Sequence, residues 1–302
     1  MLIDAIWIGM IACAVAIAYF PSYLSTIASH GKFSITSSFN NHHHQSASHS
    51  LLQWLEKTQL QQLLAWFINM QVPKSYFTHF YITGSIVSLC LLTSNDKSNF
   101  SIPLCLFLLH VSRRLYECLY ITIYGDSKIH LAGYLVGILH YVLVPISIGL
   151  INVNNNQSAK ALTLASSSSI VVFIIANIMQ FRFHYILFLA KLKMKSNHHT
   201  ISGTTIGING TIDGSKDKYK YPLPEGIGFD SVCCPHYTAE IIIYLSLWMM
   251  DMYNYTTALV FLWVVANLSV VANLQFQWYK EQYGHELMVK RKHWKRLIPG
   301  GW

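Results

Sequence analysis

The chain has 302 residues, of which 53% are hydrophobic and only 11% are charged. Because soluble domains carry about 25% charged residues, this composition excludes an ordinary soluble globular protein. The formal net charge of +8 comes from basic residues that flank apolar segments, a pattern of membrane topology and not of a nucleic-acid-binding surface. The sequence therefore predicts a polytopic membrane protein without a separate soluble domain.

Apolar segments recur along the chain, and each is long enough to cross roughly 30 Å of hydrocarbon. The first, residues 1–20, carries Asp4 and no small-residue cleavage site, so we expect a retained span and not a signal peptide. The fold class is therefore all-α, with about seven transmembrane helices (six if one long span is re-entrant) in a single transmembrane domain over residues 1–302. The other spans are expected near residues 76–94, 100–124, 130–151, 161–190, 236–250 and 257–279.

Three polar or mixed segments separate these spans. Residues 29–50 are rich in Ser, Asn and His, but nothing organises the histidines into a metal site, so we expect a disordered loop and no metal. Residues 51–69 have mixed polarity with helical periodicity, which indicates a helix at the membrane interface. Residues 192–220 contain glycines without the dinucleotide-binding G-x-G-x-x-G pattern, so a flexible cytosolic insertion is expected.

The distribution of basic residues predicts the orientation in the membrane. Sixteen of the 21 Lys and Arg residues lie in segments on one side, two lie on the other and three lie within spans. The positive side is normally cytosolic, so we expect a luminal or external N-terminus, with the C-terminus and residues 191–235 in the cytosol. Four of the six cysteines lie in apolar spans and the remaining two, Cys233 and Cys234, face a reducing compartment, so packing is their expected role.

The segment from Tyr221 to Glu240, YPLPEGIGFDSVCCPHYTAE, is too polar and too rich in Pro and Gly to be buried in the membrane. Pro235 suits the first position of a helix, and Glu240 then shares a face with His236. A helix N-terminus beside a Gly-bearing loop is a ready site for an anion. A plain re-entry loop, in which Glu240 only complements the helix dipole, is the alternative interpretation.

Polar side chains inside the spans are costly to bury, so each is a candidate for function. In the third span, His110, Arg113 or Arg114, and Glu117 form one stripe, with Tyr116 beside it. A purely structural salt bridge between Arg113 and Glu117 is the alternative.

The fifth span places Gln180, His184 and Lys191 on one face and directs Arg182 elsewhere. Most of these polar groups lie toward the cytosolic ends of their spans. Together they predict a polar cavity that opens to the cytosol.

Several strings resemble the steroid 5α-reductase family. The segment YPLPEGIGFDSVCCPHYTAEIIIY, with QFRFHYIL before it and QWYKEQY after it, resembles the C-terminal half of that family. VPKSYFTHFY (residues 72–81) and RRLYECLY (residues 113–120) are similar to its polyprenol reductase branch. The resemblance covers residues 66–280 in patches.

The resemblance implies a multi-pass enzyme of the endoplasmic reticulum membrane that binds NADPH from the cytosolic side. It would saturate the α-isoprene double bond of a polyprenol-derived lipid, in the dolichol synthesis that serves protein N-glycosylation. The implied cofactor-binding positions are Gln180, His184, Lys191, Tyr221, His236, Glu240 and Tyr279.

Two positions depart from the family pattern. Val111 stands where steroid-reducing members have a tyrosine, which argues against a steroid substrate. Phe276, beside Gln275, stands where the family usually carries a histidine three residues before Tyr279.

The chemistry favours an aldehyde as the species reduced, because an isolated allylic-alcohol double bond is a poor hydride acceptor whereas conjugation to a carbonyl makes the β carbon electrophilic. The candidates for the polar end of a polyprenal site are His110, Tyr116, Glu117 and Tyr81. Two alternatives stay open: a trans-2-enoyl-CoA reductase of fatty-acid elongation, which only the C-terminal strings resemble, and a non-catalytic lipid-binding membrane protein, toward which Phe276 points.

Overall fold

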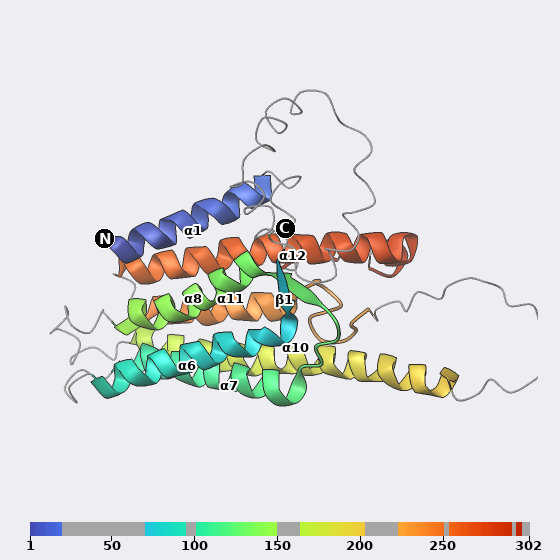
Figure 1. Ribbon diagram of the computed structural model, residues 1–302, viewed down its shortest axis with the longest axis horizontal. Coiled ribbons are helices and arrows are strands. Elements are labelled where there is room, and N and C mark those ends of the chain that lie inside the picture. Colours follow the sequence, from blue (N-terminus) through green and yellow to red (C-terminus); the bar gives the residue numbers. More distant parts are fainter. Residues whose placement is uncertain are drawn as a thin grey trace, which may run out of the picture.

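The computed structural model describes residues 1–19, 70–94, 101–149, 164–202, 223–250, 254–291 and 294–297. The loop expected at 29–50, the interfacial helix expected at 51–69 and the cofactor candidate Tyr221 lie outside these ranges. Figure 1 shows the described helices running side by side along one long axis.

Seven helices make up almost all of the described chain, and each coincides with one expected span, which confirms the all-α membrane fold. They are α1 (Leu2–Tyr19), α6 (Phe77–Ser94), α7 (Ile102–Tyr116), α8 (Leu131–Gly149), α10 (Leu164–Ser202), α11 (Pro235–Met249) and α12 (Tyr255–Lys290). The expected insertion at 192–220 begins within α10, and its part beyond Ser202 lies outside the described residues up to 222.

Two of these helices are short. Five stretches of the described chain are long and apolar enough to cross a membrane, and they lie in α1, α6, α8, α10 and α12. The other two helices, α7 and α11, have 15 residues each, or about 22 Å at 1.5 Å per residue. α7 is prolonged by a π-helical turn, η2 (Glu117–Ile121), a distortion that is frequent at functional sites.

Local signals explain where the two short helices begin. The Ser101 side chain accepts a hydrogen bond from the Leu104 backbone N–H at 3.3 Å and so caps α7. α11 begins at Pro235 as predicted, since a proline in the first turn removes only an N–H that would have no helical partner.

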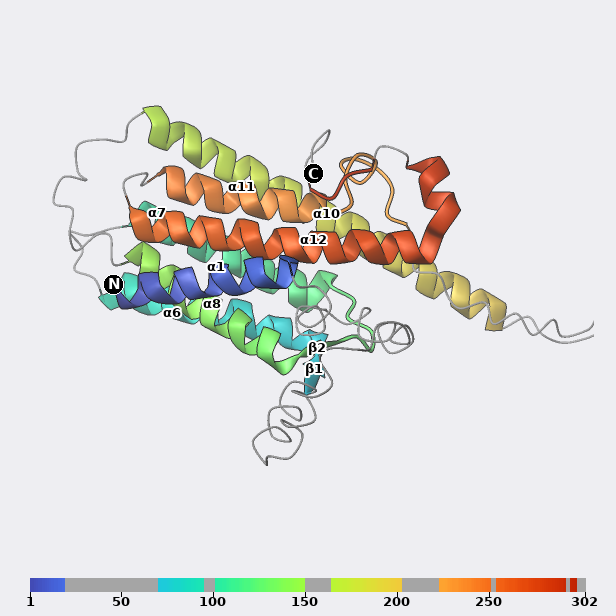
Figure 2. The same ribbon diagram turned by 90° about the horizontal axis from the view of Figure 1, so that it is seen from above.

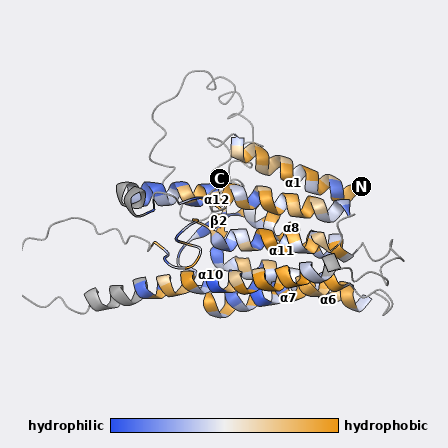
Figure 3. Ribbon diagram, turned by 180° about the vertical axis from the view of Figure 1, so that it is seen from behind, coloured by the Kyte–Doolittle hydropathy of each residue, from blue (hydrophilic) through white to orange (hydrophobic). Residues whose placement is uncertain are grey.

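The apolar core lies between pairs of packed helices. α10 packs on α11, α6 packs on both α7 and α8, and α12 packs on both α1 and α11 (Figure 2). Trp7, Phe107 and Phe173 are fully buried in this core, and Trp7 also donates a hydrogen bond from Nε1 to Ser147 Oγ at 3.1 Å. Figure 3 shows mainly hydrophobic ribbon along the bundle and more hydrophilic ribbon on the projecting end of α12.

A small cap closes one end of the bundle. Strand β1 (Gln71–Pro73) pairs antiparallel with β2 (Lys128–His130), just before the starts of α6 and α8; the 3-10 turn η1 (Lys74–Tyr76) links β1 to α6. At the same end, the loop before α11 pairs with the C-terminal segment through a bridge between Val232 and Lys295. The last turns of α12 bend away at Gly284, whose φ of 45° is accessible to glycine at little cost.

The same loop is held against α10 by a glycine. Gly228 has a φ of 83°, and a Cβ atom at this position would lie 2.8 Å from the Phe183 ring. Arg291 donates to the Phe229 carbonyl at 2.6 Å and pairs with Asp230 at 2.8 Å, which ties the loop to the end of α12.

The contact between α6 and α8 leads to a stability prediction. A Cβ atom on Gly137 would lie 2.5 Å from Cζ of the buried Phe80, so Gly137→Ala should destabilise the protein by about 1–3 kcal/mol through overpacking. Gly9→Ala is the matched control, because no described atom lies within 4 Å of its added Cβ and alanine favours a helix by about 0.5–1 kcal/mol. Thermal unfolding in detergent should show a lower midpoint only for Gly137→Ala; equal midpoints would contradict this packing.

Candidate active site

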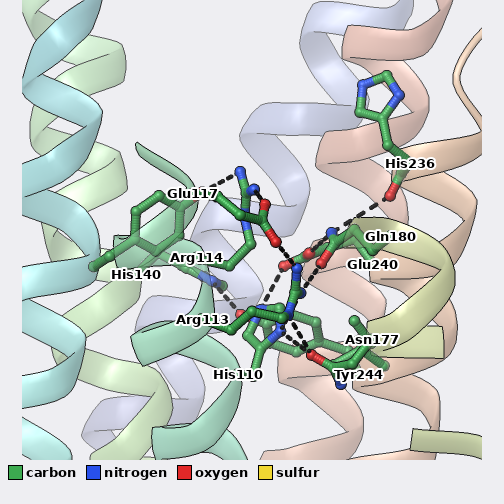
Figure 4. Close-up of polar contacts among 12 residues, drawn as sticks. His110, Arg113, Arg114, Glu117, His140, Asn177, Gln180, His236, Glu240 and Tyr244 are labelled. Carbon is green, nitrogen blue, oxygen red and sulfur yellow. Dashed lines mark hydrogen bonds and ion pairs between the residues drawn. The ribbon is translucent and has the colours of Figure 1, made fainter. Parts of the chain in front are cut away.

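Polar side chains from α6, α7, α10 and α11 meet inside the bundle, and Figure 4 shows many of them turned toward one another. We call this set the buried polar cluster; its members are Tyr81, His110, Arg113, Arg114, Glu117, Asn177, Gln180, His184 and Glu240. His110, Glu117 and Gln180 are almost completely shielded from solvent. A set of charges this deeply buried persists only when its members satisfy one another.

Glu117 is the centre of the cluster. One carboxylate oxygen pairs with Arg113 and the other with Arg114, while His184 Nδ1 lies 2.6 Å from Oε2. The Arg113–Glu117 salt bridge that the sequence offered as a structural alternative is therefore present. It is one part of a larger set of contacts that joins α7 to α10.

Arg114 connects the cluster to α6 through Tyr81. Its Nε and second terminal nitrogen donate to the Tyr81 hydroxyl oxygen at 3.2 and 2.9 Å, and the guanidinium carbon lies 5.0 Å from the centre of the Tyr81 ring. The contact combines charge-assisted hydrogen bonds with a cation–π interaction.

Asn177 on α10 contacts both Arg113 and His110 on α7. Its amide nitrogen donates to the Phe173 carbonyl at 2.9 Å, so its oxygen faces Arg113 Nε at 3.1 Å and His110 Nδ1 at 3.0 Å. The donor Arg113 Nη2 also lies 3.3 Å from the same His110 Nδ1 atom, so these contacts are compatible with either tautomer of the ring. His110 Nε2 lies 3.3 Å from a Glu240 carboxylate oxygen, out of hydrogen-bonding alignment.

Gln180 connects the cluster to α11. Its side-chain oxygen accepts from Arg113, and its nitrogen donates to Glu240 and approaches the His236 carbonyl at 3.5 Å. The His236 ring lies 5.5 Å from that of His184. Its Nδ1 atom is buried without a hydrogen-bond partner among the described residues.

The structure brings together seven of the eleven site residues predicted from sequence: Tyr81, His110, Glu117, Gln180, His184, His236 and Glu240. Lys191 lies farther along α10 and donates to the Ile123 carbonyl at 2.8 Å. Tyr279 packs in a neighbouring aromatic group, with Trp294 5.4 Å away. Tyr116 is 53% exposed, and its ring lies 5.1 Å from that of Tyr120.

Three residues that join or adjoin the cluster were not singled out from the sequence. Asn177 precedes Gln180 by three positions and Tyr244 follows Glu240 by four, so helical spacing carries a signal for both. His140 has no polar partner at helical spacing in its apolar span. The sequence could have pointed to it only because a histidine is costly to bury there.

The central carboxylate yields a second stability prediction. Glu117→Gln should destabilise the protein by about 3–5 kcal/mol, because it leaves the buried guanidinium groups of Arg113 and Arg114 without their shared counter-charge. Glu225→Gln makes the same substitution at an exposed loop position and should be neutral. Thermal unfolding of the two purified variants in detergent measures the difference; similar midpoints would show that Glu117 does not stabilise the bundle.

Comparison with known proteins agrees with the motifs seen in the sequence. Residues 135–302 match the family described as 3-oxo-5-alpha-steroid 4-dehydrogenase. The chain is 29% identical over 262 residues to a polyprenal reductase of Caenorhabditis elegans, which covers 76% of this chain and 80% of the relative. It is 30% identical over 229 residues to a polyprenal reductase of Saccharomyces cerevisiae (76% of each chain) and 28% identical over 263 residues to one of Homo sapiens (76% and 77%). The chain therefore belongs to the 3-oxo-5-alpha-steroid 4-dehydrogenase family, the steroid 5α-reductases, whose members are oxidoreductases.

Proposed function

We propose that this protein reduces the α-isoprene double bond of a polyprenol-derived lipid, with polyprenal as the species reduced and NADPH as the reductant. The observation that carries the proposal is the buried polar cluster at one end of an apolar helical bundle. The similarity to polyprenal reductases of three organisms supports the class of lipid.

The boundary between polar and apolar residues suits a long isoprenoid with a small polar head. On α11, His236, Glu240 and Tyr244 follow one another at four-residue spacing, and the buried Leu247 comes next on that side. On α7, His110 is followed toward the core by the buried Phe107 and Leu104. A lipid chain lying along the apolar side would place its head group at this boundary.

The aldehyde is favoured over the alcohol by its electronic structure. In an α,β-unsaturated aldehyde, hydride addition to the β carbon moves negative charge onto the carbonyl oxygen, where hydrogen-bond donors stabilise it. Glu117 is fully engaged by Arg113, Arg114 and His184, so its role is to hold these groups in place. Of the sequence candidates for the polar end of the site, His110 and Tyr81 lie in the cluster with Glu117.

The residues that the family resemblance assigns to NADPH fit a dinucleotide at the polar end of the cluster. Gln180, His184 and Glu240 lie together, and the buried His236 Nδ1 atom offers an unused hydrogen-bonding position beside them. Lys191 adds positive charge farther along α10, and Tyr279 adds an aromatic face; Tyr221 lies outside the described residues. When bound, the reduced nicotinamide supplies the hydride, while these side chains bind and orient the dinucleotide.

Phe276 stands at the position where the family usually has a histidine. Its ring lies 5.1 Å from the Arg296 guanidinium carbon, and Arg296 in turn donates to Asn273 at 2.7 Å. The Arg296 guanidinium group therefore lies against the Phe276 ring. We infer that Arg296 replaces the polar group that a histidine at position 276 would provide.

The proposed location is the endoplasmic reticulum membrane, with the C-terminus in the cytosol and the product used in dolichol synthesis for protein N-glycosylation. The excess of Lys and Arg on one side of the sequence supports this orientation. In the proposed orientation the polar cluster, which lies where α11 begins and α7 ends, would be at the cytosolic end of the bundle, where NADPH is available.

Turnover by the purified protein tests the reaction. With NADPH, the protein should saturate polyprenal and should act at least tenfold more slowly on polyprenol, because only the aldehyde conjugates its double bond to a carbonyl. Products are identified by mass spectrometry. Faster turnover of the alcohol would overturn the aldehyde mechanism, and preferential saturation of trans-2-enoyl-CoA would place the protein among the enoyl-CoA reductases.

Cofactor binding is tested separately from turnover. Lys191→Gln should weaken NADPH binding by about 10-fold or more, because a hydrogen bond to a charged group contributes about 1.5–3 kcal/mol. Arg182→Gln is the matched control, since it removes the same charge from an exposed position of the same helix. Titration of NADPH fluorescence measures both; equal weakening would mean that only general charge attracts the dinucleotide, and no binding by the wild-type protein would favour the non-catalytic alternative.

A further inference from the structure

A second hydrogen-bonded chain runs beside the buried polar cluster, and the proposed function does not use it. Trp263 on α12 donates from Nε1 to His140 Nδ1 at 3.1 Å, and His140 Nε2 lies 3.0 Å from the Tyr244 hydroxyl oxygen. All three side chains are buried, with relative exposures between 2% and 9%. The chain links α12, α8 and α11, and Figure 4 shows His140 and Tyr244 beside the cluster.

The direction of these hydrogen bonds follows from the donor chemistry. An indole N–H only donates, so His140 Nδ1 must accept, and a neutral imidazole then carries its proton on Nε2. His140 Nε2 therefore donates to Tyr244, and the Tyr244 oxygen is an acceptor. The hydroxyl hydrogen of Tyr244 must point to another acceptor, and the described residues supply none.

Tyr244 lies where the head group of the proposed substrate would sit. It comes one turn after Glu240 on α11, and its ring lies 6.3 Å from that of His110 and 6.4 Å from that of Phe107. His110 and Glu240 make the longest carboxylate contact of the cluster, at 3.3 Å and out of alignment, so a substrate oxygen displaces this contact with the least loss.

Charge balance explains why a neutral donor is needed here. Within the cluster, both guanidinium groups already pair with the Glu117 carboxylate, so neither is free to face a developing oxyanion. A hydroxyl group that already accepts a hydrogen bond is a stronger donor, because hydrogen bonds in a chain polarise one another.

From these contacts, and resting on the proposed reduction of polyprenal, we propose that Tyr244 is a catalytic residue that donates its hydroxyl hydrogen bond to the substrate's carbonyl oxygen. His140 and Trp263 are positioning residues that hold Tyr244 in the donor state. The reduced nicotinamide dinucleotide that Gln180, His184 and Glu240 are proposed to hold would supply hydride for the new C–H bond at the β carbon, and the electrons of the carbon–carbon double bond would shift toward the carbonyl oxygen. Tyr244 stabilises the resulting enolate; the α carbon then takes a proton from solvent water as the carbonyl re-forms.

The test compares Tyr244→Phe with Tyr141→Phe, a neighbouring buried tyrosine on α8 that packs against His140 without a described hydrogen bond to it. Tyr244→Phe should lower kcat for polyprenal by about 10²-fold or more, as expected for loss of one oxyanion donor, with KM and NADPH affinity within threefold of wild type. Tyr141→Phe should keep wild-type kcat. Equal losses in both variants would show that packing explains the effect and would overturn the assignment.

A spectroscopic measurement addresses the hydrogen bond itself. Infrared spectra of polyprenal labelled with ¹³C at the carbonyl, bound together with NADP⁺, should show the carbonyl stretch lowered in the wild-type protein. The shift should disappear in Tyr244→Phe. An unchanged shift, or an unchanged kcat in that variant, would overturn the assignment while leaving the proposed reduction intact; no turnover by the wild-type protein would overturn both.

Trp263→Phe provides a second variant that leaves Tyr244 in place. Without the indole N–H, His140 can move its proton to Nδ1 and accept from Tyr244, which removes the free hydroxyl hydrogen in part of the population. We expect an intermediate loss of kcat and a partial loss of the carbonyl shift. If Tyr244→Phe fails to fold, this variant decides, and wild-type values for both measurements would overturn the assignment.

Discussion

The buried carboxylate of Glu117 is the interaction on which the arrangement of the helices around the site depends. It holds two guanidinium groups and approaches His184, so it fixes α7 against α10 and, through Arg114, against α6. In an apolar bundle, each of these charges alone would be strongly unfavourable. Because these charges pair with one another, the protein can bury several polar groups at the end of an otherwise apolar core.

The two short helices explain where these groups gather. α7 and α11, at 15 residues each, do not reach the length of the other helices, and the π-helical turn at Glu117 extends α7 with altered spacing. Their ends therefore meet beside loops and strands and not beside lipid tails. The cap of β1, β2 and the loop before α11 closes this end, so the polar groups lie between the apolar core and the cap.

Two hydrogen-bonded systems with different roles meet at Glu240 and Tyr244. In the charged system, the ion pairs around Glu117 hold the side chains of the cluster in place. The neutral system runs from Trp263 through His140 to Tyr244 and leaves the Tyr244 hydroxyl hydrogen without a described acceptor. The aldehyde proposed as substrate would need a hydrogen-bond donor for its carbonyl oxygen that still releases the product. A neutral hydroxyl group binds the product less strongly than a cationic side chain would. The division also agrees with the departure at Val111, since the donor proposed here comes from α11 and not from that position on α7.

The sequence by itself determined the class of protein and where the seven described helices lie along the chain, because hydropathy and helical periodicity are local properties. It grouped His110 with Glu117, Gln180 with His184, and His236 with Glu240, and the structure brings these residues near one another. It did not reveal that Tyr116, one residue from Glu117, faces outward, or that His140, Tyr244 and Trp263 form a chain. Periodicity states which residues share one face of one helix, but only the packing of helices distant in sequence decides which faces meet, and that packing alone sets the hydrogen-bond directions on which the chemistry depends.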